Sequence, residues 1–308
     1  CINACPGHRY IISIQGLISV IKDFNYSGIN HWSLLRHTTL NDIKRGDTVI
    51  QAGRKLSKRG LYETEYIRRC KHIIGRTSWD YSHTKVLNHN LEYHFCNEVL
   101  RNRFYGSQNW SIENKASYSV SISKGYLPRH GLHQILRALA IVKDFFPNVQ
   151  LRIAGIDVTG GNRWVEKIST YGSYIRTLLK KLKLSDHVNF LGSISEDEMV
   201  NELRTAHVFI SASAIDNSPN SLGEAQMIGT PCISSFVGGV PDMVRDGESG
   251  LLYRFDDYVM LAFKIISIFK DNSLALLLSK NGQKAAAERH DRDQIRARML
   301  EIYSSLLI

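Results

Sequence analysis

The chain has 308 residues, of which 43% are hydrophobic, so it is long enough for one large or two ordinary domains with a sizeable core. Its apolar runs all fall short of the roughly 20 residues that a membrane-spanning helix needs. The formal net charge of +10 suits an anionic partner, but basic and aromatic residues are not interleaved as in nucleic-acid-binding proteins, so we expect no nucleic acid.

The cysteines and one histidine bear on the compartment and on metal binding. The five cysteines are an odd count without framework spacing, which favours reduced thiols in a cytoplasmic protein. Cys1, Cys5 and His8 resemble a metal site only in part, because no fourth ligand follows at the spacing of zinc sites. We therefore expect no metal ion and no cofactor.

The basic residues form one local cluster. Such a cluster is compatible with an ordinary solvated surface, and equally with peripheral contact to an anionic membrane, here the inner face of the plasma membrane. It consists of Lys44, Arg45, Arg54, Lys55, Lys58 and Arg59.

The first hundred residues predict an irregular α/β pattern. Short apolar runs favour strands, and Arg- and Tyr-rich helices and loops separate them. The predicted strands are residues 10–14, 71–75 and 91–95. The pattern breaks near residues 105–109, where we place a domain boundary.

From about residue 118, predicted strands and helices alternate regularly. Repeated βα units predict a parallel sheet covered by helices on both faces, with ligands at the carboxyl ends of the strands. The predicted strands are residues 117–123, 149–155, 187–192, 208–211 and 230–235. The predicted helices are residues 132–146, 173–182, 195–206, 221–228 and 292–307.

The sharpest candidate site lies in residues 211–232, a strand, a polar loop, a helix start and a strand. Asp216 lies on the loop and Glu224 about a turn inside the helix, so both carboxylates can face one crevice. Carboxylates match the vicinal hydroxyls of sugars and riboses, and the helix N-terminus between them suits a diphosphate. In the alternative interpretation, Asp216 and Asn217 form only an Asx turn and Glu224 is a solvated helix residue.

The motif Asp216-Asn-Ser-Pro-Asn-Ser-Leu-Gly-Glu224, followed by Gly229-Thr-Pro231 and residues 237–242, resembles the donor-site signature of the retaining glycosyltransferase family 4, which has the GT-B fold. Residues 188–192 and 246–252 resemble flanking parts of that signature, in the form that builds bacterial polysaccharides.

The resemblance implies an α/β protein with two Rossmann-like domains. Residues 1–108 would form the N-terminal, acceptor-side domain, and residues 109–290 the C-terminal domain that binds the nucleotide-sugar donor. Residues 291–308 would be a helix that packs back on the N-terminal domain. Because only about 108 residues precede the boundary, we expect the N-terminal domain to be incomplete.

The resemblance also implies roles for single residues. Asp216, beside Asn217, would contact the hydroxyls of the donor sugar, and Glu224 those of the ribose. Gly192 belongs to the strand and turn that would contact the nucleobase. The diphosphate would lie against the backbone at the helix start, at Asn220, Ser221 and Leu222.

In the family, an Arg and a Lys on the loop after the first strand of the donor domain neutralise the leaving diphosphate. Lys124 lies near the usual Arg, but His130 occupies the place of the usual Lys. In one interpretation Arg129 or a protonated His130 compensates, although a neutral imidazole would stabilise phosphate charge poorly. In the other, Lys124 and Arg129 are ordinary loop charges.

On the N-terminal side, Gln15 and Gly16 follow a predicted strand, and Gln15 stands where many family members have a His. Glutamine donates and accepts hydrogen bonds but cannot act as an acid or base. We expect Gln15 either to position donor or acceptor, or to satisfy backbone groups at the strand end. Arg76 is expected to meet a phosphate or to pair with Asp80, and Glu98 to start a helix.

The predicted function is transfer of a hexosyl unit from a UDP- or GDP-sugar to a hydroxyl of a glycan or lipid-linked acceptor. The resemblance implies that the anomeric configuration is retained and that no metal ion takes part. One alternative is a non-catalytic nucleotide-sugar-binding protein, suggested by the incomplete domain, His130 and Gln15. Another is a sugar-nucleotide epimerase of the same overall fold.

Overall fold

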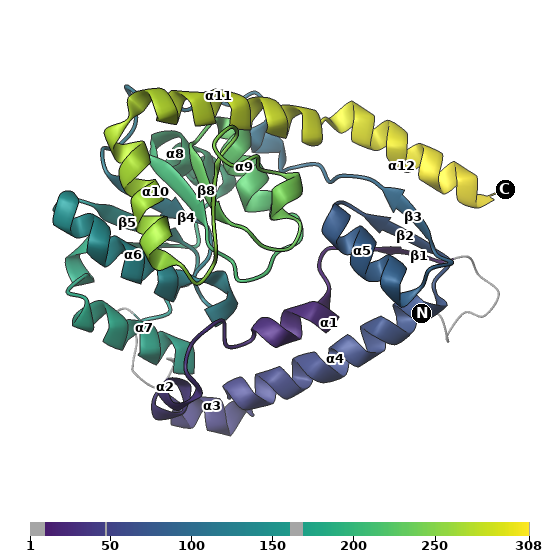
Figure 1. Ribbon diagram of the computed structural model, residues 1–308, viewed down its shortest axis with the longest axis horizontal. Helices are drawn as coiled ribbons and strands as arrows, with labels where there is room; N and C mark the ends of the chain where they lie inside the picture. The colour runs from purple at the N-terminus through teal and green to yellow at the C-terminus, as the bar shows by residue number, and fades with distance from the viewer. Residues whose placement is uncertain (1–9, 47, 161–168, 308) are drawn as a thin grey trace.

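The computed structural model describes residues 10–46, 48–160 and 169–307, which form two parallel sheets with helices around them (Figure 1). The smaller sheet has the order β1-β2-β3. Its strands are β1 (Ile11–Ser13), β2 (His72–Gly75) and β3 (Glu92–Phe95). They confirm the three strands predicted for the first hundred residues.

The larger sheet has six parallel strands in the order β6-β5-β4-β7-β8-β9. The chain moves outward from β4 in one direction and, from β7, in the other, which is the doubly wound order of Rossmann-like domains. Its strands are β4 (Ser119–Ile122), β5 (Gln150–Ala154), β6 (Val188–Gly192), β7 (Val208–Ser211), β8 (Cys232–Ser235) and β9 (Leu251–Tyr253). Five of the six coincide with predicted strands, whereas β9 was missed.

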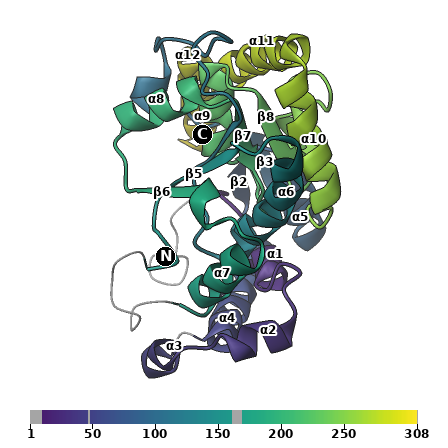
Figure 2. The same ribbon diagram turned by 90° about the vertical axis from the view of Figure 1, so that its left-hand side faces the viewer.

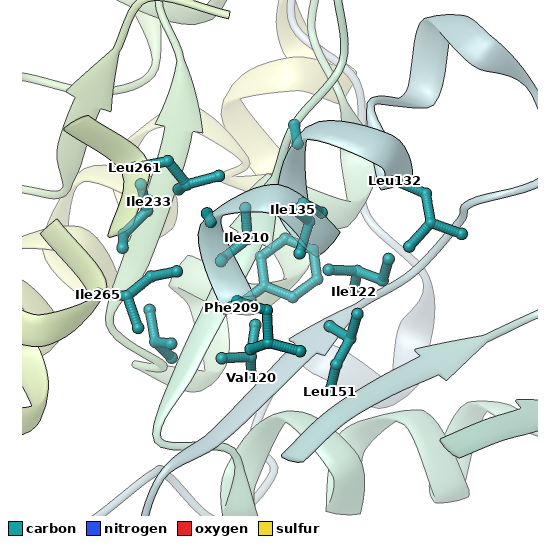
Figure 3. Packing of buried hydrophobic residues seen from close by; sticks show 14 of the residues in the cluster. Val120, Ile122, Leu132, Ile135, Leu151, Phe209, Ile210, Ile233, Leu261 and Ile265 are labelled. Atoms are coloured by element: carbon teal, nitrogen blue, oxygen red, sulfur yellow. The ribbon is translucent and has the colours of Figure 1, made fainter. Parts of the chain in front are cut away.

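Helices cover both faces of the larger sheet and close its core. In Figure 3, Val120, Ile210 and Ile233 of the strands pack with Ile135 of α6 and Leu261 of α10. Each fully buried aliphatic side chain of this kind contributes roughly 1.5–3 kcal/mol of transfer free energy. These helices are α6 (Leu132–Phe145), α7 (Thr170–Lys181), α8 (Glu196–Thr205), α9 (Asn220–Ile228), α10 (Tyr258–Lys270) and α11 (Asn272–Arg289).

The helices between β1 and β2 do not all belong to the smaller sheet. Helix α1 (Ile18–Ile21) packs on the long helix α4 (Val49–Arg69), while α2 (His31–Arg36) and α3 (Leu40–Arg45) lie beside α7 (Figure 2). Ile29 and Leu34 join the core of the larger sheet. The Asp42 carboxylate accepts hydrogen bonds from the Thr170 backbone N–H (2.7 Å) and hydroxyl (2.6 Å). Part of the predicted domain 1–108 therefore packs on the C-terminal half.

The last helix, α12 (Arg292–Leu307), runs from the larger sheet back over the smaller one (Figure 1). Ile302 is buried with Ile74 and Cys96, and Ile295 and Met299 pack on the same cluster. Residues 96–118 form the forward connection between the sheets, and the predicted boundary at 108–109 falls within it. Within the described residues, none of the helices combines the length and the apolar character that crossing a membrane requires.

Candidate functional site

The candidate site lies where the larger sheet reverses its winding, at the carboxyl ends of β4 and β7. β4 and β7 are neighbours at the point where the strand order reverses, and this is the position at which doubly wound sheets form their ligand-binding crevice. Lys124 follows β4 and Asp216 follows β7. Their side chains meet across this point, with Lys124 Nζ 3.1 Å from Asp216 Oδ2.

The loop after β4 is fixed by backbone contact with the loop after β7. Gly131 has a φ of +75°, and a Cβ there would lie 1.9 Å from the carbonyl oxygen of Ala212. The Arg129 carbonyl accepts a hydrogen bond from the Ala214 N–H (2.7 Å). These contacts hold the loop that carries Lys124 and Arg129 beside Asp216.

His130 is buried at the start of α6, with its ring edge-on to Tyr126. Burial, helped by the positive charges of Lys124 and Arg129, lowers the pKa of His130 to about 3. The ring is therefore neutral near pH 7, which argues against the protonated alternative. The cations at this loop are Lys124 and Arg129, and burial lowers the pKa of the Arg129 guanidinium.

The loop that carries Asp216 and Asn217 makes more than a local turn. The Asn217 N–H donates to Asp216 Oδ1 (3.1 Å), one residue on rather than the two residues of an Asx turn. The Asn217 side chain instead reaches the smaller sheet, where it accepts from the Thr77 hydroxyl (2.5 Å) and donates to Asp80 Oδ2 (2.7 Å). Gly239 allows this approach, because a Cβ there would lie 2.3 Å from the Asn217 carbonyl oxygen.

Helix α9 starts at the crevice without a side-chain cap. Pro219 occupies the N-cap position, so the first turn keeps backbone N–H groups for another acceptor. The Leu222 N–H already donates to the Pro219 carbonyl (3.0 Å), which makes Asn220 and Ser221 the better candidates for contact with a diphosphate.

Glu224 lies one turn inside α9 and is not a solvated helix residue. Its side chain is only 6% exposed and is held by Arg101 in a bidentate pair, with Nε–Oε1 at 2.7 Å and Nη2–Oε2 at 2.9 Å. Arg101 comes from the connection between the two sheets and is partly exposed. No local pattern in the sequence indicates this partner, because it lies 123 residues away.

Three residues from the smaller sheet and α9 converge on Glu98. Gln15 Nε2 donates to Glu98 Oε1 (3.3 Å), while Arg76 Nη1 (2.6 Å) and Asn220 Nδ2 (3.1 Å) contact Oε2. The prediction that Glu98 starts a helix is wrong, because it lies in the irregular segment after β3. Carboxylates are common at helix starts, but the Glu98 carboxylate is held instead by Gln15 and Arg76, which follow the neighbouring strands β1 and β2.

The predicted pairing of the Arg76 side chain with Asp80 is not observed. The Arg76 guanidinium pairs with Glu98, and Asp80 accepts instead from the Arg76 backbone N–H (3.0 Å). Asp80 also accepts from the Tyr93 hydroxyl, and it is fully buried. The Gln15 side chain also contacts Glu98, so it does more than satisfy backbone groups at the end of its strand.

The two predicted glycines lie at strand ends of different sheets. Gly192 ends β6 with a φ of +73° and open space where a Cβ would be, and its carbonyl accepts from the Gly155 N–H (2.7 Å). Gly16 follows β1 and approaches Ile21. Cys1, Cys5 and His8, weighed as metal ligands, lie outside the described residues.

Comparisons with known proteins agree with this architecture. The family model for glycosyl transferases group 1 matches residues 108–285. The D-inositol 3-phosphate glycosyltransferase of Streptomyces scabiei is 29% identical over 175 residues, which are 56% of this chain and 38% of that protein. The chain thus spans well under half the length of this curated relative.

Solved structures share the fold across both sheets. Sucrose-phosphate synthase from Thermosynechococcus elongatus superposes with a TM-score of 0.72 at 19% identity, covering 99% of this chain and 70% of that one. Anabaena HepE in complex with UDP-glucose gives a TM-score of 0.72 at 16% identity, covering 97% and 72%. These likenesses confirm the GT-B fold, and the family match shows that the chain belongs to the glycosyl transferases group 1.

Proposed function

We propose that this chain is the catalytic part of a retaining glycosyltransferase that moves a hexosyl unit from a UDP- or GDP-sugar to a hydroxyl of a glycan or lipid-linked acceptor. The observation that carries the proposal is the Lys124–Asp216 pair at the switch point, beside the uncapped start of α9 with Glu224 one turn further in. The carboxylates of Asp216 and Glu224 are each paired with a cation, Lys124 and Arg101 respectively, rather than packed against apolar side chains alone.

Each part of a nucleoside diphosphate sugar has a chemically matching partner in this arrangement. Asp216 accepts hydrogen bonds from the hydroxyls of the sugar, and Glu224 from those of the ribose. The backbone at Asn220 and Ser221, with Lys124 and Arg129, binds the diphosphate. As the bond from the anomeric carbon to the diphosphate oxygen breaks, negative charge grows on the phosphate, and these preorganised groups stabilise it without a metal ion in the donor site.

Proteins of the same fold support the choice of donor. HepE was solved with UDP-glucose, and TarM of S. aureus with UDP. The curated relatives include glycosyltransferases for D-inositol 3-phosphate and for lipopolysaccharide core biosynthesis. The bound UDP or UDP-glucose of HepE and TarM is the type of donor nucleotide that the proposal assigns to this chain.

Calorimetric titration with UDP, GDP and their hexose conjugates tests the donor site. Asp216→Ala should weaken binding of the hexose conjugates, and Glu224→Ala binding of nucleotides and conjugates alike, each about tenfold or more, since a hydrogen bond to a charged group contributes roughly 1.5–3 kcal/mol. Glu248→Ala, an exposed carboxylate elsewhere in the same half, is the matched control and should bind normally. Wild-type protein that binds neither UDP nor GDP would contradict the proposal.

A non-catalytic nucleotide-sugar-binding protein is the second candidate, and the neutral His130 favours it. A buried uncharged imidazole gives the leaving diphosphate less stabilisation than a lysine at that place. Measuring both donor binding and release of nucleotide from UDP- and GDP-sugars separates the two. Binding with neither transfer nor hydrolysis would favour the binding protein.

The basic cluster on α3 and α4 extends the proposal to the inner face of the plasma membrane. Lys44, Arg45, Arg54 and Lys58 are exposed, and the apolar side chains of Leu40 and Ile43 are exposed beside them. Basic and apolar side chains together favour a surface rich in anionic lipid. Sedimentation with phosphatidylglycerol vesicles, but not with phosphatidylcholine vesicles, is expected, and equal recovery with both would contradict it.

A further inference from the structure

A second group of chemically active side chains lies on the smaller sheet, on the face that α12 covers. In the parallel register His72 pairs with Glu92, and Ile74 with His94. Because alternate residues of a strand share a face, His72, Glu92 and His94 project from the same face as Ile74, which packs against Ile302 of α12. None of the three takes part in the donor site described above.

The ligand atoms of these three residues converge on one point. His72 Nδ1 lies 3.3 Å from His94 Nε2, Glu92 Oε2 lies 3.4 Å from His72 Nδ1, and Glu92 Oε1 lies 3.7 Å from His94 Nε2. A tetrahedral zinc ion with bonds of about 2.0–2.2 Å holds its ligand atoms roughly 3.3–3.6 Å apart. The separations of 3.3 and 3.4 Å from His72 Nδ1 match this spacing, and the separation of 3.7 Å, which involves the other Glu92 oxygen, is slightly longer.

The surroundings suit a metal ion with one open side. The side chains of His72 and His94 are largely buried, whereas that of Glu92 is 57% exposed, so solvent reaches the group from one direction. The nearby cation Arg298 donates to the Phe95 carbonyl and pairs with Glu301, which offsets its charge.

We propose that His72, Glu92 and His94 bind a divalent transition-metal ion, zinc by the chemistry of the ligands, with water completing the coordination. Two imidazoles and one carboxylate are a ligand set that zinc accepts. The ion ties β2 to β3 at the start of both strands. Arg76 lies four residues further on, about 13 Å along an extended strand, so the ion has a structural role separate from the donor site.

Metal titration of the purified, chelator-treated chain tests the site directly. Binding of one equivalent of Zn²⁺ is expected by calorimetry, with a rise in the thermal unfolding midpoint. Co²⁺ should give the visible absorption of a site with nitrogen and oxygen ligands. Glu92→Gln should weaken Zn²⁺ binding at least roughly tenfold, because even the loss of a residue that only orients a ligand has that effect.

Matched variants keep the result unambiguous. His89→Ala removes an exposed histidine of the same sheet region and should leave binding unchanged. A variant with Cys1→Ser, Cys5→Ser and His8→Ala tests the other potential zinc ligands and should also bind normally. Glu92 is exposed, so Glu92→Gln is expected to fold even where His94→Ala does not. Absence of one-to-one binding, or binding that survives Glu92→Gln and is lost in the Cys1/Cys5/His8 variant, would overturn the proposal.

Discussion

At the scale of single residues, Arg101 determines how accessible Glu224 is to a ligand, because it pairs with that carboxylate. It occupies both oxygens of the carboxylate that the family resemblance assigns to the ribose, and its hydrogen bonds with Glu224 raise the pKa of Arg101. A ribose that uses the same oxygens has to share them with the guanidinium or displace it. We therefore expect Arg101 to compete with a bound donor for Glu224.

Arg101→Ala should strengthen UDP binding severalfold, because Glu224 then meets the ribose without first losing its partner. The same change should lower the free energy of unfolding by about 1–3 kcal/mol, since it leaves a buried carboxylate unpaired. Titration calorimetry and urea unfolding measure the two effects. Arg103→Ala, which breaks an exposed pair with Asp197, is the control. Weaker UDP binding in Arg101→Ala would show that Arg101 positions Glu224 rather than competing for it.

Four buried histidines predict a loss of stability in mild acid. Burial lowers the pKa of His130 and His207 to about 3, and of His133 and His290 to about 4. The unfolded chain protonates these rings below about pH 6.5, whereas the native state keeps them neutral. Their contribution to the free energy of unfolding is therefore complete above pH 6.5. It is lost as the pH falls toward 4, by up to about 1.4 kcal/mol for each ring and each pH unit.

Urea unfolding between pH 7 and pH 5 measures this slope. His130→Gln should make the slope shallower, because one of the four proton-binding groups is removed from the unfolded state. His89→Gln should leave it unchanged, since the His89 side chain is exposed. A stability that does not change over this range would contradict the buried neutral rings.

At the scale of elements, the turn into α6 depends on Gly131. Its φ of +75° and its approach to the Ala212 carbonyl join the loops after β4 and β7 back to back. Only a residue without a Cβ allows both, and the joined loops bring Lys124 to Asp216. The position of the site cations is therefore a consequence of backbone packing.

Gly131→Ala should lower the free energy of unfolding by roughly 3 kcal/mol, combining left-handed strain of about 1–2 kcal/mol with a backbone clash. Gly247→Ala isolates the first contribution, because Gly247 has a similar φ of +78° but no atom near its would-be Cβ. Thermal and urea unfolding compare the two variants. Equal losses would show that the contact with Ala212 relaxes without cost.

At the scale of the whole molecule, polar contacts hold the two sheets together across the crevice. Asn217 bridges to Thr77 and Asp80, and the Asp242 carboxylate accepts from the Ser78 N–H and from its hydroxyl (2.8 Å) at the start of α5 (Ser78–Leu87). Asp80 and Asn217 are both buried, so breaking the hydrogen bond between them leaves buried polar groups without a partner, which is energetically costly.

Asn217→Ala should loosen the two halves, because it removes one donor from the buried Asp80 carboxylate. We expect a larger radius of gyration in small-angle scattering and a drop of about 1–3 kcal/mol in the free energy of unfolding. Asn189→Ala, on the exposed side of β6, is the control. Unchanged scattering in Asn217→Ala would mean that α12 and the connection 96–118 hold the halves without it.

Much of the fold was predictable, because local patterns dictate local structure. Alternation of buried apolar runs with amphipathic stretches indicated the strands and helices of the larger sheet. The helix predicted from residue 195 begins as α8 there, where the structure shows a capping box formed by Ser195 and Glu198. The strand β9 was missed because its three residues are too few to show a period, and α11 because its apolar residues form no clear stripe.

The sequence by itself determined which segment carries the candidate donor-binding groups. Asp216, the start of α9 and Glu224 lie close together in the chain and fold as one connection from a strand to a helix. The tertiary structure alone decided what those groups meet. Arg101 on Glu224, Glu98 among Gln15, Arg76 and Asn220, and the burial that keeps His130 neutral all join residues from separate elements. Their separations depend on how two sheets and a returning helix pack, and no period of two or 3.6 residues encodes that packing.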